Sequence, residues 1–376
     1  MIEVVAKKCK NYDIKKIKQI FFDIFSSSNF ISKLSSLNSV LLKPNLLGPY
    51  PPEKGVTTHP IFIAALVELL KDYNIEISLF DNPGGNVKYN EVLQKCGILN
   101  LSKKYNIEIL EPVKSGIYKF GEKPEYIINK PFLDCQAIIN LPKLKTHTLT
   151  LFTGAIKNMY GIVPGLAKSN YHRIAPHPTK FAEIVVDIYS LVKDKIIFNL
   201  MDGIIGMDGN GPSSGDSKNF GVILGSPEAI ALDFCASKMM GYNPKKIPTI
   251  MFAAERYGIS HQEIQLQGDF KETYKLENVN IRKSKNTNKI IRLFSHPFKR
   301  FIRKFFWAYP DFLPDKCSKC GNCVKSCPVS ALAIIKESPI PQLDRDKCTL
   351  CLCCIEMCSE NAVFLKKSFL GKFLIK

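Results

Sequence analysis

The sequence lacks the long apolar runs of a membrane-spanning protein and the motifs of the common nucleotide-binding folds. None of its apolar runs reaches the roughly eighteen residues from which a spanning helix is recognised. Neither G-x-G-x-x-G nor GK[ST] occurs, which excludes the usual dinucleotide fingerprint and phosphate loop. Residues 1–8 contain no apolar signal core and no small-residue cleavage site. We therefore expect a cytoplasmic protein in a reducing compartment.

Acidic side chains are missing from residues 281–307, although this segment carries nine basic ones. The whole chain of 376 residues has a net charge of +18, so half of the excess lies here. Such a charge suggests an anionic partner. No nucleic-acid-binding motif accompanies it, so we predict no nucleic-acid partner.

Cysteine is abundant, with nine of the thirteen residues near the end of the chain. The spacing C-x2-C-x2-C-x3-C occurs there twice, offset by 31 residues. This is the bacterial iron–sulfur pattern, in which the fourth cysteine of each run ligates the other cluster. We predict two [4Fe–4S] clusters, the first held by Cys317, Cys320, Cys323 and Cys358 and the second by Cys348, Cys351, Cys354 and Cys327. The tandem repeat resembles the bacterial two-cluster ferredoxin over residues 314–366.

Zinc is the main alternative, because structural zinc sites also use Cys-x2-Cys pairs. Zinc takes four ligands per site and usually separates its pairs by longer loops, so two equal runs of four favour iron–sulfur clusters. Cys353 lies between two proposed ligands and leaves the third ligand of the second run open; we assign it to Cys354. The remaining four cysteines are predicted to be buried thiols: Cys9, Cys96, Cys135 and Cys235.

Strand-like and helical patterns alternate through the first 245 residues. Asp13, for example, precedes apolar residues at helical spacing and is a suitable cap for that helix. The predicted strands cover residues 39–42, 75–80, 137–141, 196–200 and 221–224. This alternation predicts an α/β fold, a mostly parallel sheet with helices on both faces. The C-terminal ferredoxin-like domain is expected to be a small α+β unit.

Polar side chains follow the predicted strands at their carboxyl ends, where ligands bind in open α/β sheets. We expect eight of them to converge on one cleft: Lys43, Asn45, Asp81, Asn82, Lys143, Lys145, His147 and Asp202. Lys157 and Asn158 lie beside a glycine-flanked bend and are further ligand-binding candidates. The lysines, predicted at loop bends, suit a carboxylate or phosphate group and so a small anionic substrate.

Two further features leave alternatives open at this cleft. Residues 202–215 contain five glycines and predict a loop whose amides can approach a ligand closely. His147, His172 and His177 would form a metal site if they met Asp202 or Asp208. A flavin is a further alternative, although no motif indicates one.

Four stretches of this part resemble a known family: residues 42–45, 140–147, 154–161 and 208–215. On these stretches the chain is similar to domain-of-unknown-function family 362 over roughly residues 1–245. Members of that family often carry a C-terminal ferredoxin module. The resemblance implies an iron–sulfur protein and names no reaction.

A connector is predicted between the two parts. The expected division is an α/β domain at 1–245, a connector at 246–313, the ferredoxin-like domain at 314–366 and a tail at 367–376. Residues 298–306 place phenylalanines and an isoleucine on one helical face and four basic residues on the other. Such a helix would pack the two parts together, lie on an anionic membrane surface or dock an acidic electron-transfer protein.

These features favour an iron–sulfur protein that transfers electrons to or from a substrate or cofactor held in the α/β domain. A protein with this function would be a ferredoxin-linked oxidoreductase, and its partner would be a redox protein. Two alternatives stay open. One is an electron carrier that docks a partner without catalysis of its own, and the other is a non-redox metal- or phosphate-binding enzyme with structural clusters.

Overall fold

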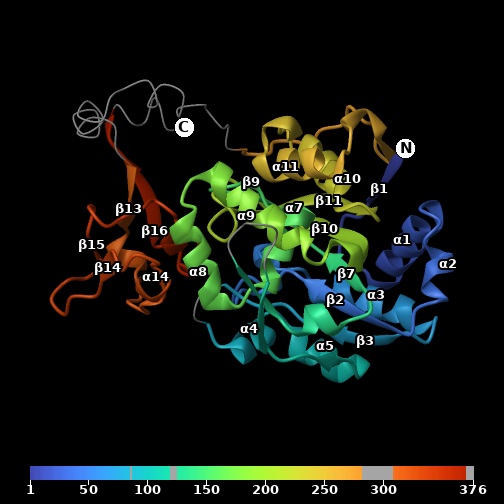
Figure 1. Cartoon of the computed structure of the whole chain (residues 1–376), viewed down its shortest axis with the longest axis horizontal. Helices are drawn as coiled ribbons and strands as arrows, with labels where there is room; N and C mark the ends of the chain where they lie inside the picture. Colours follow the sequence, from blue (N-terminus) through green and yellow to red (C-terminus); the bar gives the residue numbers. More distant parts are fainter. Residues whose placement is uncertain (85–86, 119–124, 282–307, 370–376) are drawn as a thin grey trace.

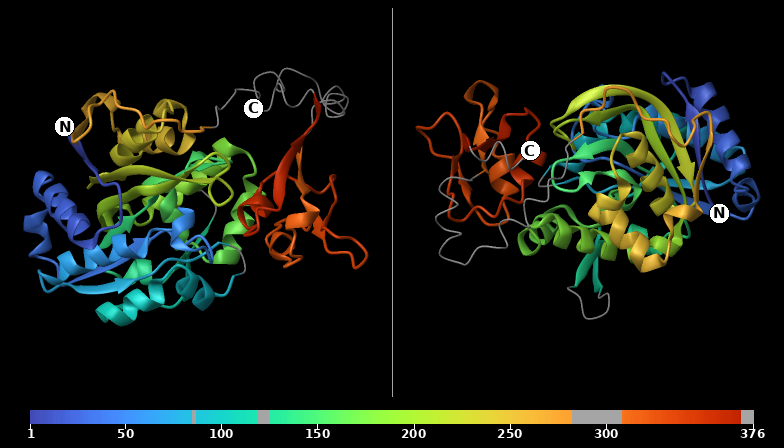
Figure 2. Two further views of the ribbon diagram at one scale, coloured as in Figure 1. Left: turned by 180° about the vertical axis from the view of Figure 1, so that it is seen from behind. Right: turned by 90° about the horizontal axis from the view of Figure 1, so that it is seen from above.

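The computed structural model describes residues 1–84, 87–118, 125–281 and 308–369. The basic segment from 282 onward and the predicted amphipathic helix at 298–306 lie outside these residues. The described part forms a large α/β domain and a smaller C-terminal module (residues 308–369), which lies beside helix α8 in Figures 1 and 2.

A ten-stranded mixed sheet forms the centre of the α/β domain. Its main path runs β12-β1-β11-β10-β7-β2-β3-β4, and the short strands β8 and β9 branch from β10. The strands are β1 (Ile2–Lys8), β2 (Ser39–Pro44), β3 (Glu76–Leu79), β4 (Glu108–Ile109), β7 (Ile138–Leu141), β8 (Lys143–His147), β9 (Leu151–Phe152), β10 (Ile196–Asp208), β11 (Asp216–Ser226) and β12 (Ile264–Gly268). The neighbours of β2, β3 and β7 are all parallel, whereas β11 is antiparallel to both of its neighbours. The predicted α/β class with a mostly parallel sheet is confirmed.

Helices cover both faces of this sheet. The α-helices of the domain are α1 (Ile14–Ser27), α2 (Ile31–Leu34), α3 (Pro60–Lys71), α4 (Tyr89–Lys95), α5 (Ile98–Tyr105), α6 (Pro131–Asp134), α7 (Gly154–Asn158), α8 (Gly165–Ile174), α9 (Pro178–Ser190), α10 (Ala229–Met239) and α11 (Pro248–Tyr257). In β2, Leu41 joins the core under α7, α9 and α10, while Val40 and Leu42 join the core under α1 and α3. This alternation is the two-residue period of a strand buried on both faces.

Shorter elements complete the domain. A hairpin consists of β5 (Lys114–Tyr118) and β6 (Tyr126–Asn129). The 3-10 turns are η1 (Pro52–Lys54), η2 (Met159–Ile162), η3 (Lys193–Lys195), η4 (Pro244–Lys246) and η5 (His261–Glu263). As predicted, Asp13 caps α1, its carboxylate accepting from the amide of Lys16 at 2.9 Å.

Two segments expected as loops are strands. Residues 143–147 form β8, and residues 202–208 continue β10 alongside β11, so only 209–215 of the glycine-rich stretch is a loop. The glycines serve close packing there: a Cβ on Gly206 would lie 2.3 Å from the carbonyl oxygen of Leu144. The strand continues because β11 offers backbone partners as far as Asp208, which pairs with Asp216.

The α/β domain also extends beyond residue 245, where the sequence placed its end. Helix α11 packs against α9, and β12 pairs in parallel with β1. Much of the expected connector is therefore part of the large sheet and its helical layer.

The C-terminal module is built around a small apolar core that includes several of its cysteines. Its elements are β13 (Ala308–Phe312), η6 (Pro314–Lys316), α14 (Asn322–Lys325), β14 (Leu332–Ala333), β15 (Gln342–Leu343), α15 (Cys353–Glu356) and β16 (Val363–Lys367). Strand β13 pairs antiparallel with β16, and β14 with β15. The two short helices α14 and α15 lie within the two cysteine runs and contact each other.

Candidate functional site

Lys43, at the carboxyl end of β2, forms the centre of a buried polar network. Its ammonium lies 2.6 Å from Asp81 Oδ1, and both side chains are almost completely buried. It also donates to the carbonyl oxygen of Pro44 at 2.9 Å and to Asn158 Oδ1 at 3.3 Å. Three acceptors use all three ammonium hydrogens. Burial lowers the pKa of Lys43, and the charge of Asp81 opposes this effect.

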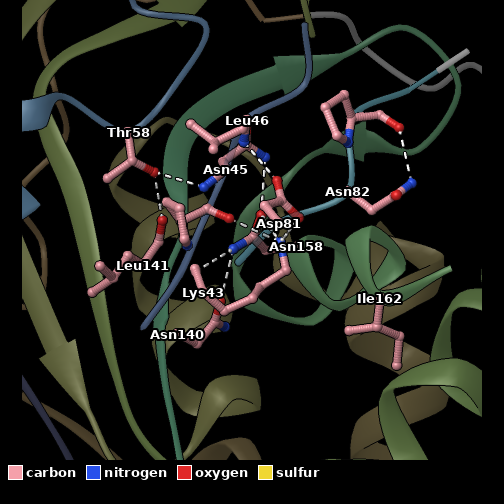
Figure 3. Close-up of polar contacts among 12 residues, drawn as sticks. Lys43, Asn45, Leu46, Thr58, Asp81, Asn82, Asn140, Leu141, Asn158 and Ile162 are labelled. Atoms are coloured by element: carbon pink, nitrogen blue, oxygen red, sulfur yellow. Dashed lines mark hydrogen bonds and ion pairs between the residues drawn. The ribbon is translucent and has the colours of Figure 1, made fainter. Parts of the chain in front are cut away.

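Asparagine side chains extend this network toward β7 and α7 (Figure 3). Asn158 accepts from Asn45 Nδ2 at 2.9 Å and donates to Asn140 Oδ1 at 2.8 Å. The second oxygen of Asp81 accepts from the amide of Leu46 at 2.6 Å. These bonds fix the ends of β2, β3 and β7 against α7, as expected for buried polar groups.

A cavity of about 80 Å³ lies beside this network, between the α/β domain and α15 of the module. We call it the junction cavity and define it by its lining residues. The α/β domain contributes Lys43, Asn45, Leu47, Asp81, Asn82, Gly84, Lys145, His147, Thr153, Lys157, Asn158, Tyr160, Gly161, Lys168, Ser169, His172 and Pro212, and the module contributes Cys353, Glu356 and Met357.

Three lysines in the cavity wall have no carboxylate partner among the described residues. Lys145 is completely buried and donates to Asn45 Oδ1 at 3.0 Å and to the carbonyl of Val56 at 2.7 Å. Lys168 donates to two carbonyls, of Asn82 and Pro83. Lys157 lies over the ring of Tyr160, 5.4 Å from its centre.

Burial lowers the pKa of all three lysines. The shift of Lys145 is large and is increased by the nearby charges of Lys157 and Lys143. The pKa of Lys157 is also lowered, and that of Lys168 falls to about 7. The cavity wall thus gathers three lysines, and burial makes the charged form of each one costly.

Two histidines and one carboxyl group complete the polar lining. His147 accepts at Nδ1 from the amides of Leu149 and Thr150, which places its proton on Nε2, 3.5 Å from Glu356 Oε1. Burial raises the pKa of Glu356 to about 7. His172 stacks on Phe181 with ring centres 4.1 Å apart. Burial and the charge of Lys157 lower the pKa of His172 to about 3, so its ring is neutral.

The expected convergence on one cleft holds for six of the eight strand-end residues and fails for two. Lys143 and Asp202 pair at 2.7 Å and do not line the junction cavity. Tyr12 donates to Asp202 at 2.9 Å, and its ring stacks on His59 at 3.6 Å. Lys143 and Lys145 are two residues apart and would share one face of a regular strand. The pairing of β8 with β10 is irregular between them, because Lys143 lies opposite Asp202 and Lys145 opposite Met207, and this register shift accompanies the separation of the two lysines.

The two parts of the chain are in direct contact beside the cavity. The hydroxyl of Ser213 donates to the carbonyl of Glu356 at 2.8 Å, and that of Ser214 donates to the carbonyl of Ile355 at 3.4 Å. On the opposite side, Met357 packs so closely that a Cβ on Gly84 would lie 3.1 Å from its sulfur.

Among the cysteines predicted to ligate the first cluster, Cys323 has the other three as neighbours. The pKa of Cys323 is raised to about 11, by burial first and then by the neighbouring thiols of Cys358 and Cys320. Cys317 is a further neighbour. Cys358, from the second run, therefore lies with the first three cysteines of the first run.

Among the cysteines predicted to ligate the second cluster, Cys354 likewise has the other three as neighbours. The pKa of Cys354 is raised well above its usual value, by burial first and then by Cys351 and Cys348. Cys323 and Cys327 also raise the pKa of Cys354, and Cys327 raises the pKa of Cys348 as well. These neighbours agree with the crossed ligand scheme, while no three of the thiols are grouped closely enough to hold a single metal ion in the described residues.

Cys353 occupies a different position from Cys354. It lines the junction cavity, whereas Cys354 belongs to the core of the module beside Cys323 and Cys358. This placement favours Cys354 as the third ligand of the second run. The other predicted thiols are buried at Cys9, Cys96 and Cys235 and partly buried at Cys135.

The alternative metal site of histidines is not assembled. Within residues 1–84, 87–118, 125–281 and 308–369, no three His, Cys, Asp or Glu side chains are grouped so as to hold one metal ion. His177 instead caps α9, accepting from the amide of Thr179.

Sequence reasoning missed several residues of the cavity wall. Lys168, Tyr160 and the module residues Glu356 and Met357 were not singled out, and His172 was considered only as a metal ligand. Lys168 and Tyr160 lie in helical segments many positions after the preceding β-strand, and Glu356 lies inside a cysteine run. No strand-end pattern therefore points to these residues.

Comparisons with known proteins agree with this architecture. Residues 40–238 match a family model described as Domain of unknown function (DUF362), and residues 310–359 match one described as 4Fe-4S dicluster domain. The chain is 32% identical over 231 residues to the thylakoid-associated protein sll1697 of Synechocystis, covering 60% of this chain and 70% of that protein.

A solved structure that matches part of the chain is the lactate racemase apoprotein from Thermoanaerobacterium thermosaccharolyticum. The TM-score is 0.39 and the identity 14%, over 60% of this chain. The chain spans only 54% of that structure. No helix in the described part of the chain is long and apolar enough to cross a bilayer.

Proposed function

The chain belongs to the DUF362 family and is an iron–sulfur protein with a C-terminal 4Fe-4S domain. We propose that it transfers electrons between a redox partner and a small molecule bound in the junction cavity. Two [4Fe–4S] clusters are held by the crossed cysteine sets. When bound, they supply one-electron oxidation and reduction.

The observation that carries this proposal is the position of Cys353. It lies between the proposed ligands Cys351 and Cys354 in sequence, and its side chain forms part of the cavity wall together with Lys157. A molecule in the cavity is therefore separated from the second cysteine set by little more than this residue. A substrate-binding site at this place has a route for electrons, which the α/β domain alone lacks.

The exposed cysteine of the first set suits contact with an electron-transfer partner. Cys320, in the first set, is exposed, whereas Cys351 and Cys354 in the second set are buried. Cys323 of the first set is among the neighbours that raise the pKa of Cys354 in the second set, which supports two adjacent sets. Electrons from a redox protein would enter near Cys320 and leave near Cys353.

The α/β domain supplies the ligand site in this proposal. Lys145, His147 and Lys157 contact the bound molecule, while Lys43, Asn45, Asp81 and Asn158 hold the wall in position. Lys143 and Asp202 form a separate buried pair that stabilises the adjoining strand β8. A cavity of about 80 Å³ suits a small molecule better than a flavin, since pockets for larger ligands measure about 300 Å³ or more. We propose a cytoplasmic location, because both clusters need reduced thiolates.

The first test is the metal content of protein purified without oxygen. We expect about eight iron atoms per chain and a visible spectrum that bleaches with dithionite. One or two zinc atoms per chain, with no bleaching, would contradict the proposal.

The second test asks whether electrons reach the cavity. The reduced protein is mixed anaerobically with the small-molecule fraction of a cell extract, and its absorbance is followed. Reoxidation that is lost in Lys157→Met and kept in the exposed control Lys15→Met supports the proposal. Equal reoxidation of all three proteins would support an electron carrier without its own substrate site.

A further inference from the structure

The lysines of the junction cavity have hydrogen-bond donors that the protein does not use. An ammonium group carries three donors. Lys145 and Lys168 each have two acceptors among the described residues, which leaves one donor each. The ammonium of Lys157 lies over the rings of Tyr160 and Phe181 and makes no hydrogen bond to any described residue. All three of its donors are therefore free. Lys43, by contrast, has three acceptors and no free donor.

The charges of the wall are also unbalanced. Asp81 compensates Lys43 at 2.6 Å, which leaves Glu356 as the other carboxyl group of the lining against Lys145, Lys157 and Lys168. Uncompensated charge is costly to bury. An anion in the cavity would remove this cost for the three lysines together.

His172 provides a second, independent sign of a missing ligand. Its side chain is 4% exposed, it lines the cavity, and its Nδ1 has no hydrogen-bond partner among the described residues. Buried ring nitrogens without a partner are uncommon in folded proteins. Because the ring is held between Phe181 and Tyr160, it cannot turn freely toward solvent.

The apolar part of the wall limits the size of the ligand. Leu47, Tyr160 and Met357 line the cavity beside the polar groups. Its volume of about 80 Å³ leaves room for a few heavy atoms around one charged group.

We propose that the junction cavity binds a compact molecule with an oxyanion group, a carboxylate, phosphate or sulfate, through the free donors of Lys157, Lys145 and Lys168, with His172 at its side. This inference names the substrate class of the proposed function and rests on the same cavity. It concerns binding alone, so it is measured without any electron transfer.

The test is calorimetric titration of the full-length, cluster-loaded protein without oxygen and at fixed ionic strength. The probes are acetate, oxalate, phosphate and sulfate, with acetamide as the neutral analogue of acetate. We expect at least one of the four anions to bind at one site per chain and acetamide not to bind. Lys157→Met should weaken that binding at least tenfold, while Lys157→Arg keeps most of it.

Controls separate this site from the general positive charge of the chain. Lys15→Met removes one exposed charge and should leave the affinity unchanged. Unchanged iron content and circular dichroism show that Lys157→Met is folded. If no anion binds, if acetamide binds as well as acetate, or if Lys157→Met binds like the native protein, the inference is wrong. Anion binding without electron exchange would overturn the proposed function and leave this inference standing.

Discussion

The hydroxyl of Ser213 donates a hydrogen bond of 2.8 Å to the backbone carbonyl of Glu356. Ser213 belongs to the loop after β10, and Glu356 is the last residue of α15, so this bond joins the α/β domain to the cysteine-rich module. Both residues are buried. The distance between the cavity lysines and the second cysteine set therefore depends on this contact.

Replacement of Ser213 by alanine should loosen the module. A buried hydrogen bond contributes about 1 kcal/mol, so α15 should open about fivefold more often. Hydrogen exchange at the amides of α15 measures this change. Ser36→Ala removes a bond of the same length at an exposed site and should leave α15 unchanged. Equal exchange in both variants would show that Ser213 does not hold the module.

The buried pair of Lys43 and Asp81 should be sensitive to loss of one partner. Asp81→Asn leaves a buried ammonium without its counter-charge, which costs about 3–5 kcal/mol. The free energy of unfolding from anaerobic urea titration measures this cost. Asp134→Asn breaks an exposed pair with Lys130 and should cost about 1 kcal/mol or less. Similar values for the two variants would argue against a structural role for the Lys43 network.

The neighbouring cysteines of α15 should differ in their effect on iron content. Cys354→Ala removes a ligand, and we expect it to lose the second cluster and about half of the iron. Cys353→Ser should retain about eight iron atoms per chain, because Cys353 faces the cavity. Iron analysis and low-temperature electron paramagnetic resonance distinguish the two. The reverse result would make Cys353 the ligand.

The sequence predicted the fold class and the cysteine pattern because both depend on local spacing. Strand and helix periods identify β2, β3 and β7, and the cysteine repeat is readable residue by residue. The split of the strand-end residues was not predictable. Lys143 and Lys145 would share one face of a regular strand, so strand formation alone does not separate them. Their separation accompanies a register shift in the pairing of β8 with β10, which depends on residues far away in the sequence.

The cavity wall escaped prediction for a related reason. Cys353 and Glu356 meet Lys157 only when the module docks, and docking brings together residues about 200 positions apart. Strand-end reasoning applies within one sheet and cannot locate a wall supplied by another part of the chain.

Anion binding should weaken as the pH rises through about 7. Burial lowers the pKa of Lys168 to about 7. The charge of Asp81 raises this pKa, whereas the charges of Lys43 and Lys157 lower it further. Below this pH the ammonium is charged and attracts the anion; above it the amine is neutral. Calorimetry at several pH values, in buffers of different ionisation enthalpy, should show weaker binding and proton uptake at the higher pH.

Lys168→Arg is the matched control for this pH dependence. Arginine keeps its charge across the whole range, so the fall in affinity near pH 7 should become smaller. Groups elsewhere in the cavity titrate equally in both proteins and drop out of the comparison. An identical pH profile in the two proteins would show that Lys168 does not contact the anion.

The most direct measurement of the central claim is a redox titration of both clusters with and without the tightest-binding anion of the four. An anion beside the second cysteine set opposes the added electron, so the midpoint potential of one cluster should fall while the other stays unchanged. A tenfold weaker affinity for the reduced protein corresponds to about 59 mV. Lys157→Met should abolish the shift. If neither potential moves, or if both move equally in the native protein and in Lys157→Met, the cavity and the second cluster are not coupled and the account is wrong.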